Sequence, residues 1–366
     1  AGGADGGIMS TGNYPGRANN AEELRADLDF ALSMLPGTMR VNIHAMYLES
    51  DKPVSRDAIT PEHFANWIQW AKEKQIGLDF NPTCFGHPMM VDGMTLSSPN
   101  ADVRKFWIEH AIACRKIAAG MGKALGNTCV TNYWFPDGFK DTPYDRLAAR
   151  ARLKDALDEV FAEEISKEYN LDAVECKLFG IGAESCTIGS HEFYMGYAVS
   201  RNKLCCLDAG HFHPTEVISD KISSTLLFLD EILLHVSRGV RWDSDHVVLL
   251  DDETKEICKE IVRCDALDRV FIALDYFDAS INRLCAWVTG VRSMQKALLS
   301  AILQPYAEMK KLQDEGNFTK VFYMHERVKY LPFCDVWDEY LARQGLKEDW
   351  WEEVEKFEKE VIAKRG

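Results

Sequence analysis

Short apolar runs rich in β-branched residues alternate with longer helical segments along most of this chain, and this alternation restricts the possible folds most strongly. Seven runs have the length and composition of strands, and seven other segments have helical character. The expected strands are Arg40–Leu48, Gly77–Thr83, Thr128–Phe135, Ala173–Phe179, Lys203–Ala209, Leu233–Ser237 and Val270–Phe277. The expected helices are Ala21–Met34, Pro61–Lys74, Asp102–Lys123, Tyr144–Lys167, Pro214–Leu229, Asp252–Arg263 and Ile281–Leu303.

Strands that alternate with helices predict βαβ units and a parallel sheet in an α/β protein. Seven such units indicate a (β/α)8 TIM barrel with one strand missing from this chain, and an open doubly wound sheet is the alternative. We favour the barrel because polar residues follow most of the strands, whereas an open sheet concentrates its site at one switch point. Residues 1–303 would form the barrel, and residues 304–366, rich in Glu and Lys, a helical extension outside it or against another subunit.

Composition excludes several classes of function. The formal net charge of −15 should repel phosphate backbones, so we expect no nucleic-acid partner. The 11 cysteines are an odd number and contain no CxxC pair, which fits reduced thiols in the cytoplasm. No apolar stretch reaches the roughly 20 residues that span a bilayer, and the first residues lack the pattern of a signal peptide.

Side chains that bind metals lie at the ends of four consecutive expected strands. A buried carboxylate is costly unless it is paired or coordinates a cation, so acids at the ends of buried strands need an explanation. Oxygen ligands with a few imidazoles and no obvious thiolate favour Mn²⁺, Mg²⁺ or Co²⁺ over a structural zinc. The candidate ligands are Glu175, Asp208, His211, His235, Asp243, Asp245 and Asp275.

Each of these residues also has a purely structural interpretation. A single Asp after a strand is more often a helix cap, and His235, within an apolar run, is more often a hydrogen-bonded core histidine. Asp243 and Asp245 could form an Asx turn. The hypothesis of a metal site depends on the whole constellation and not on any one member.

Several segments around these residues closely resemble the L-rhamnose isomerase family, and the match runs nearly from end to end. The segments are Thr11–Gly16, Asn42–Asp51, Trp134–Gly138, Glu175–Ser185 (ECKLFGIGAES), Leu207–Glu216 (LDAGHFHPTE), Arg241–Asp252 (RWDSDHVVLLDD) and Asp278–Arg283. The resemblance implies a xylose-isomerase-like (β/α)8 barrel, a homotetramer and two divalent cations per subunit, with Mn²⁺ expected and Co²⁺, Mg²⁺ or Zn²⁺ as alternatives. It also implies a first strand before Thr11–Gly16, which this sequence lacks.

The resemblance also suggests a role for each candidate. Glu175, Asp208, His235 and Asp275 resemble the ligands of a structural metal, and His211, Asp243 and Asp245 those of a catalytic metal, with Asp208 as a possible bridge. Lys177 lies on the same strand face as Glu175 and resembles the lysine that contacts the sugar oxygen at C1. Trp134 resembles a wall of the sugar pocket, with barrel packing as its alternative. We expect His44 to help open the sugar ring, unless it is a packed core histidine.

The expected reaction is therefore the interconversion of L-rhamnose and L-rhamnulose, an aldose and its ketose. Hydrogen could move between the two carbons through an enediol, with a protein base, or directly as hydride while a metal pair polarises the carbonyl. The residues favour the hydride route, because no isolated Glu stands out as a base. The alternatives are another metal-dependent aldose isomerase or epimerase on the same barrel, or a sugar-binding protein without catalysis. A metal-dependent nuclease is disfavoured by the acidity of the chain.

Overall fold

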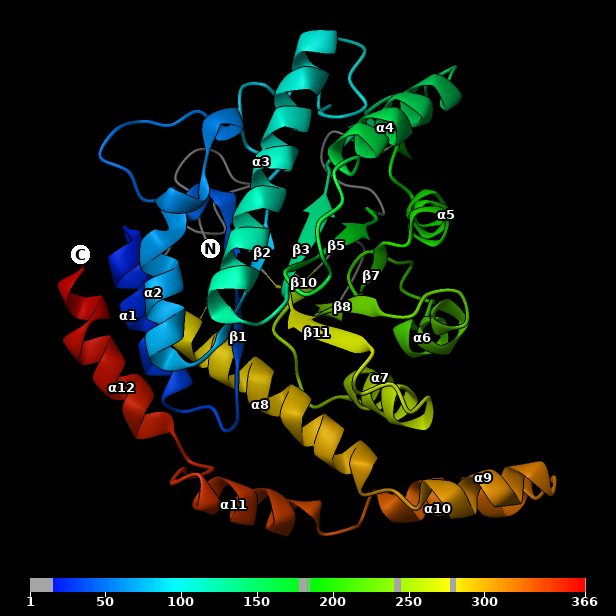
Figure 1. Cartoon of the computed structure of the whole chain (residues 1–366). Helices are drawn as coiled ribbons and strands as arrows, with labels where there is room; N and C mark the ends of the chain where they lie inside the picture. The colour runs from blue at the N-terminus through cyan, green and yellow to red at the C-terminus, as the bar shows by residue number, and fades with distance from the viewer. Residues whose placement is uncertain (1–15, 178–182, 184, 240–244, 277–280, 366) are drawn as a thin grey trace.

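The computed structural model describes residues 16–177, 183, 185–239, 245–276 and 281–365. Its main feature is a curled parallel sheet with helices on its outer face (Figure 1). The seven strands of this sheet are β1 (Arg40–His44), β2 (Gly77–Asn81), β3 (Cys129–Trp134), β5 (Asn170–Glu175), β7 (Leu204–Asp208), β8 (Ile232–Val236) and β11 (Val270–Leu274). Two small hairpins pair β4 (Gly138–Phe139) with β6 (Cys186–Thr187), and β9 (Arg238–Gly239) with β10 (Asp245–His246).

The strand order decides between the barrel and the open sheet. Neighbours in the sheet follow the order β1-β2-β3-β5-β7-β8-β11, and every pair is parallel. A doubly wound sheet would reverse direction at a switch point, whereas a barrel winds one way throughout. The sheet therefore confirms the expected barrel architecture, and each expected strand is present within a few residues of its expected bounds.

Helices cover the outside of the sheet, and a helical extension follows. They are α1 (Ala21–Leu32), α2 (Ala65–Lys74), α3 (Ala101–Leu125), α4 (Leu147–Val160), α5 (His191–Arg201), α6 (Ile218–Leu226), α7 (Asp252–Arg263), α8 (Arg283–Ile302), α9 (Tyr306–Asp314), α10 (Phe318–Val328), α11 (Phe333–Arg343) and α12 (Trp351–Glu360). In Figure 1 the hairpin of α9 and α10 projects away from the sheet, while α12 returns to α1. No helix in the described ranges is both long and apolar enough to cross a membrane.

The sequence interpretation was wrong about two helices. The segment Tyr144–Lys167 was expected to be one long helix, but α4 covers only Leu147–Val160. The helix α5 was not expected at all, since its aromatic residues and Gly196 give it weak helix propensity. Tyr194, Tyr197 and Ala198 of α5 are buried against the sheet, and this packing accounts for the helix.

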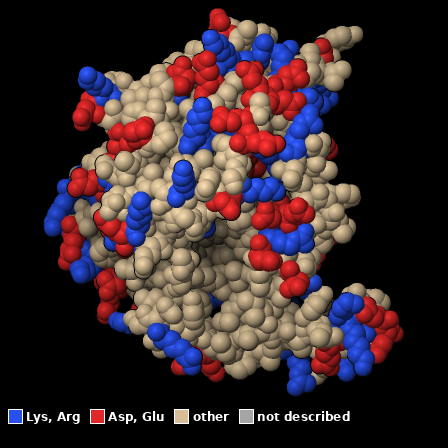
Figure 2. Space-filling model, viewed as in Figure 1, with Lys and Arg blue, Asp and Glu red and all other residues tan. Residues whose placement is uncertain are grey.

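The described sheet has two edges, β1 and β11, and an apolar groove of about 520 Å³ lies between them. Val41 and Ile43 of β1 line one side of the groove, and Ile272 and Leu274 of β11 line the other. Figure 2 shows a hollow lined mainly by uncharged residues in the region where these strands lie in Figure 1, with Lys, Arg, Asp and Glu gathered around it. The groove therefore lies between the two edge strands, β1 and β11, which do not pair with each other in the described sheet.

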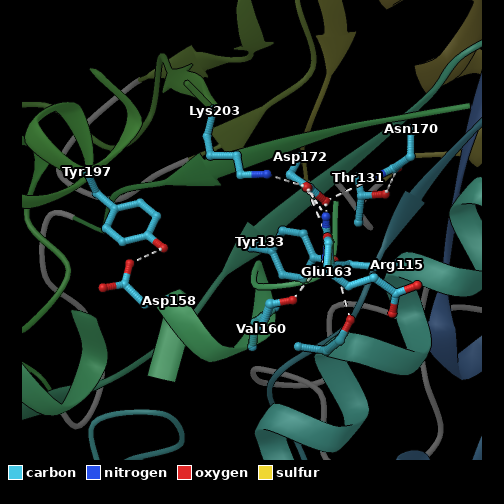
Figure 3. A network of polar contacts seen from close by, with 11 residues as sticks. Arg115, Thr131, Tyr133, Asp158, Val160, Glu163, Asn170, Asp172, Tyr197 and Lys203 are labelled. Carbon is cyan, nitrogen blue, oxygen red and sulfur yellow. Dashed lines mark hydrogen bonds and ion pairs between the residues drawn. The ribbon is translucent and has the colours of Figure 1, made fainter. Parts of the chain in front are cut away.

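A buried ionic network joins α3 to the amino-terminal end of β5 (Figure 3). The guanidinium of Arg115 binds the carboxylate of Asp172, with 2.9 Å between Nη2 and Oδ2, and Lys203 Nζ lies 2.9 Å from the same oxygen. Asn170 donates a hydrogen bond of 2.8 Å to Asp172 Oδ1. Because Asp172 faces the helices, this network lies behind the sheet and three residues before the end of β5.

Candidate metal centre

The alternation of side chains along the strands explains why polar groups meet inside the barrel. Residues two positions apart on a strand point to the same side. An apolar layer inside the sheet includes Ala173, Cys206, Leu233 and Ala273. The side chains two residues further along the four strands therefore form the next interior layer, at the carboxyl ends. They are Glu175, Asp208, His235 and Asp275.

These four side chains form the first cluster of possible ligands. His235 Nδ1 lies 3.5 Å from Glu175 Oε2, 3.5 Å from Asp208 Oδ2 and 3.2 Å from Asp275 Oδ2. One possible ligand atom from each of the four lies within 4.8 Å of those of the others. Glu175, Asp208 and His235 are buried, whereas the side chain of Asp275 is 40% exposed.

A second cluster shares Asp208 with the first. His211, in the turn after β7, and Asp245, in β10, bring possible ligand atoms within 4.8 Å of one another and of Asp208. His211 Nδ1 lies 3.1 Å from Glu175 Oε1 and 4.0 Å from Asp208 Oδ2, so the two clusters are contiguous. Asp208 is the only residue common to these two groups in the part of the chain that the structure describes.

Two buried polar atoms test whether this arrangement suits a cation. Asp208 Oδ2 and His235 Nδ1 make no hydrogen bond within the described ranges, although both are shielded from water. A buried acceptor without a donor is costly, and a bound cation is a common reason for one. Carboxylate and imidazole groups also suit divalent metals such as Mn²⁺. The residues present therefore fit a pair of adjacent metal ions that share Asp208.

Burial and neighbouring charges shift the pKa values of the acids and histidines at this centre. Burial alone would raise the pKa of Glu175, but His235 and His211 lower it below its ordinary value. Burial lowers the pKa of each histidine, but the surrounding acids overcome this and raise it well above the usual range. Burial, helped by the charge of Asp208, raises the pKa of Asp245 to about 8. Protons therefore compete with a cation for this site.

Three supporting residues were missed from the sequence. Asn132 of β3 donates a short hydrogen bond to Glu175 Oε2, and Ser237 donates one of 3.0 Å to Asp245 Oδ1. The backbone N–H of Gly210 donates a hydrogen bond of 2.7 Å to Asp208 Oδ1. Each contact joins residues whose proximity depends on the folded chain, apart from the Asx-type contact of Gly210, which the Asp-Ala-Gly spacing could have suggested.

The residues expected to touch the sugar surround the same centre. Lys177 Nζ lies 5.2 Å from the centre of the Trp134 ring, and that ring stacks on His211 with 6.4 Å between ring centres. Phe85 meets Trp134 edge-on at 5.4 Å and His44 at 6.4 Å, so it connects the two rings. His44 lines the same groove as His235 and Asp275. Burial lowers the pKa of His44 to about 4, so its imidazole is neutral near pH 7.

The structure thus brings six of the seven expected ligands together, and Asp243 lies outside the described residues. Lys177, Trp134 and His44 lie around these six. Cys206, which was not among the expected ligands, approaches Glu175 and His235 closely enough to form a third possible group of ligands.

Comparison with known proteins identifies the family of this chain. The family model of L-rhamnose isomerase matches residues 1–365. L-rhamnose isomerase of Cronobacter sakazakii is 59% identical over 362 residues, covering 98% of this chain and 87% of the relative. The Escherichia coli K12 enzyme is 58% identical over 363 residues, covering 99% and 87%. A solved L-ribulose 3-epimerase matches with a TM-score of 0.51 at 12% identity, covering 80% of this chain and 93% of that one, and it shares the fold alone. The chain therefore belongs to the L-rhamnose isomerase family.

Proposed function

We propose that this chain interconverts L-rhamnose and L-rhamnulose at the metal centre on the carboxyl ends of the strands. The observation that carries this proposal is the convergence of Glu175, Asp208, His211, His235, Asp245 and Asp275 in a member of this family. The relatives that match nearly the whole chain are L-rhamnose isomerases. No comparable concentration of acids and imidazoles occurs elsewhere in the described ranges.

The ligands divide between two cations. We assign Glu175, Asp208, His235 and Asp275 to a structural ion, and His211, Asp243, Asp245 and Asp208 to a catalytic ion. Mn²⁺ is the proposed occupant of both positions, with Co²⁺, Mg²⁺ or Zn²⁺ as substitutes, because the donors are carboxylates and imidazoles. When bound, the ions would polarise the sugar carbonyl and stabilise the negative charge that develops on its oxygen.

The protein side chains orient the sugar and add to this stabilisation. Lys177 is buried and adjoins the Trp134 ring, so its ammonium adds a fixed positive charge near the position of the C1 oxygen. Trp134 and Phe85 supply an apolar wall suited to the methyl group at C6 of rhamnose. His44 meets the Phe85 ring edge-on and can exchange hydrogen bonds with hydroxyl groups as the sugar ring opens.

We propose direct hydride transfer between C1 and C2. The described acids at this centre all belong to the two ligand groups, which leaves none assigned as a carbon base. The test is isomerisation in D₂O by the Mn²⁺-loaded protein, followed by NMR of the product at C1. Little deuterium at C1 is expected, and extensive incorporation there would support an enediol route instead. A panel of aldoses and ketoses run in parallel would identify an epimerase or an isomerase of different specificity, and sugar binding without turnover would indicate a non-catalytic protein.

We also propose that residues 304–366 contact other subunits in a cytoplasmic homotetramer. The α9–α10 hairpin projects from the sheet, and its Phe322 and the following Tyr330 are 71% and 91% exposed. Large aromatic residues exposed on a projecting element are typical of subunit contacts. Sedimentation of the wild-type protein, Phe322→Glu and Tyr330→Glu tests this arrangement. Both variants are expected to sediment as a smaller species than the wild-type protein.

A further inference from the structure

Thr83, in the turn that follows β2, contacts the imidazole ring of His44. His44 ends β1, and its Nδ1 lies 3.0 Å from the Oγ1 of Thr83. This is the ring's one hydrogen bond within the described part of the chain. The other ring nitrogen, Nε2, lies on the far side of the imidazole from Thr83. The ring itself lines the groove shared with His235 and Asp275.

Thr83 occupies this position in an unfavourable backbone conformation. Its φ angle is 56°, in the left-handed region that a β-branched residue rarely adopts, and its side chain is completely buried. Such strain persists only where surrounding contacts impose it, and it is concentrated at functional sites. A glycine or asparagine would satisfy this backbone at lower cost, so the presence of threonine indicates a use for its side chain.

The surrounding contacts hold the turn firmly. Thr83 N donates a hydrogen bond of 2.8 Å to Asn81 Oδ1, which closes an Asx turn. Arg56 Nη1 donates to the carbonyl oxygens of Thr83 at 2.6 Å and of Phe85 at 2.8 Å. His110 Nε2 lies 2.6 Å from the carbonyl oxygen of Pro82. The same turn therefore places both the Thr83 hydroxyl and the Phe85 ring against His44.

The single proton of the Thr83 hydroxyl assigns the tautomer of His44. Thr83 Oγ1 lies 3.3 Å from the carbonyl oxygen of Asn81, which can only accept, so the hydroxyl proton is directed there. The hydroxyl oxygen then accepts from His44, which requires the imidazole proton on Nδ1. In a neutral ring, the lone pair is left on Nε2.

We infer that Thr83 is a positioning residue that fixes His44 as the Nδ1–H tautomer, so that Nε2 accepts a hydrogen bond from a sugar hydroxyl. The inference rests on the proposed sugar isomerase function for the identity of the donor, but the tautomer itself does not depend on that function. His44 thereby selects a hydroxyl group and not a carbonyl oxygen as its partner.

The tautomer can be measured directly by solid-state NMR of Mg²⁺-loaded protein that carries ¹³C,¹⁵N-histidine. The His44 signals are identified by their loss in His44→Gln. The ring nitrogen bonded to Cγ is Nδ1 and that bonded to Cδ2 is Nε2, so correlation spectra show which of them carries the proton. The proton is expected on Nδ1 at pH 7.5. A proton on Nε2, or on both nitrogens, would overturn the inference regardless of any variant or activity.

Two matched variants then test whether Thr83 imposes this state. Thr83→Val keeps the β-branched shape without the hydroxyl, whereas Thr83→Ser keeps the hydroxyl. In Thr83→Val we expect the Nδ1 preference of His44 to be lost and kcat/KM for L-rhamnose to fall about tenfold, the loss expected for one misplaced hydrogen bond. In Thr83→Ser the tautomer should persist and kcat/KM should stay within about threefold.

The outcomes separate the positioning role from a purely structural one. Equal losses in the two variants with an unchanged tautomer would show that Thr83 acts through packing alone and would reject the inference. If Thr83→Val does not fold, the tautomers of His44 in the wild-type protein and in Thr83→Ser still test the inference. A wild-type protein with Nδ1–H but no turnover of any sugar would reject the proposed function and leave the tautomer assignment standing.

Discussion

A methyl group at Gly210 would lie 1.8 Å from Asp245 Oδ1, well inside the contact distance of the two atoms. Gly210 also donates its backbone N–H to Asp208 Oδ1. The absence of a side chain at Gly210 therefore permits Asp208 of β7 and Asp245 of β10 to approach the same point.

We predict that Gly210→Ala displaces Asp245 and weakens the binding of Mn²⁺ by about 10- to 100-fold, the range seen when partners of metal ligands are altered. Activity at limiting Mn²⁺ should fall in parallel and recover partly at high Mn²⁺. The measurement is a titration of activity with Mn²⁺, together with calorimetric binding.

Gly196→Ala is the matched control for this substitution, since no atom of the described residues lies within 4 Å of the added methyl group. Gly196 lies within α5, where alanine is expected to stabilise the helix by roughly 0.5–1 kcal/mol. Unchanged Mn²⁺ affinity in Gly210→Ala would show that Asp245 can move without loss, and would argue against its assignment as a ligand.

The sequence could predict a site residue where one strand alone determines which way its side chain faces. Glu175 and Asp208 end apolar runs, so the period of two places each with the interior layer, whichever strand lies beside it. Asn132 and Thr83 could not be identified in this way. Their partners, Glu175 and His44, are 43 and 39 residues away in sequence, and the contacts exist only because the strands are neighbours.

The fold was predictable for a related reason. Seven strands with intervening helices allow few parallel arrangements, and their order follows from short connections. The two small hairpins were not expected, because strands of two residues such as Gly138–Phe139 are too short to show alternation. The helix α5 escaped prediction because its stability derives from Tyr194 and Tyr197 packing against the sheet and not from local preference.

Binding of Mn²⁺ should release protons, and Asp245 should contribute most of one. Burial raises the pKa of Asp245 to about 8, so its carboxyl is mostly protonated at pH 7 in the metal-free protein. The bound ion requires the ionised form, so the part of the apparent affinity that depends on Asp245 should rise with pH and level off above about pH 8. Calorimetry in buffers of different ionisation enthalpy measures the protons released.

Asp245→Asn supplies the comparison for this experiment. It should release about 0.9 fewer protons than wild type at pH 7 and about 0.5 fewer at pH 8, where half of the wild-type carboxyls are already ionised. It should also lose activity while the fold is retained, because a charge is removed from the catalytic ion. Proton release equal to wild type, or wild-type turnover, would exclude Asp245 as a ligand.

Removal of metal should destabilise the protein as well as inactivate it. Asp208 Oδ2 and His235 Nδ1 are buried and make no hydrogen bond to any described residue, so a cation that binds them in the folded state stabilises it. At a free Mn²⁺ concentration of a hundred times Kd, the free energy of unfolding should increase by about 2.7 kcal/mol for one site. Urea unfolding with Mn²⁺ and with a chelator measures the difference.

Asp208→Asn serves as the control for metal removal, since it alters the residue shared by both ligand groups. Its unfolding should respond little to Mn²⁺. A wild-type protein whose activity and unfolding midpoint are both unchanged by the chelator would contradict the assignment of a metal centre.

The ionic network around Asp172 predicts a loss of stability without a loss of catalytic capacity (Figure 3). The side chains of Asp172 and Arg115 are 4% and 3% exposed, so Asp172→Asn leaves a buried guanidinium without its counter-charge. Removal of one partner of a buried pair costs about 3–5 kcal/mol.

Asp158→Asn is the matched control, because the pair of Asp158 and Arg201 is 33% and 37% exposed, and exposed pairs contribute about 0–1 kcal/mol. Asp172 precedes Glu175 by three residues, which places it about 10 Å along the strand and on the opposite face. The turnover number per folded molecule of Asp172→Asn should therefore match wild type below its unfolding transition. Equal stability of the two variants in urea would show that the buried network is not an important source of stability.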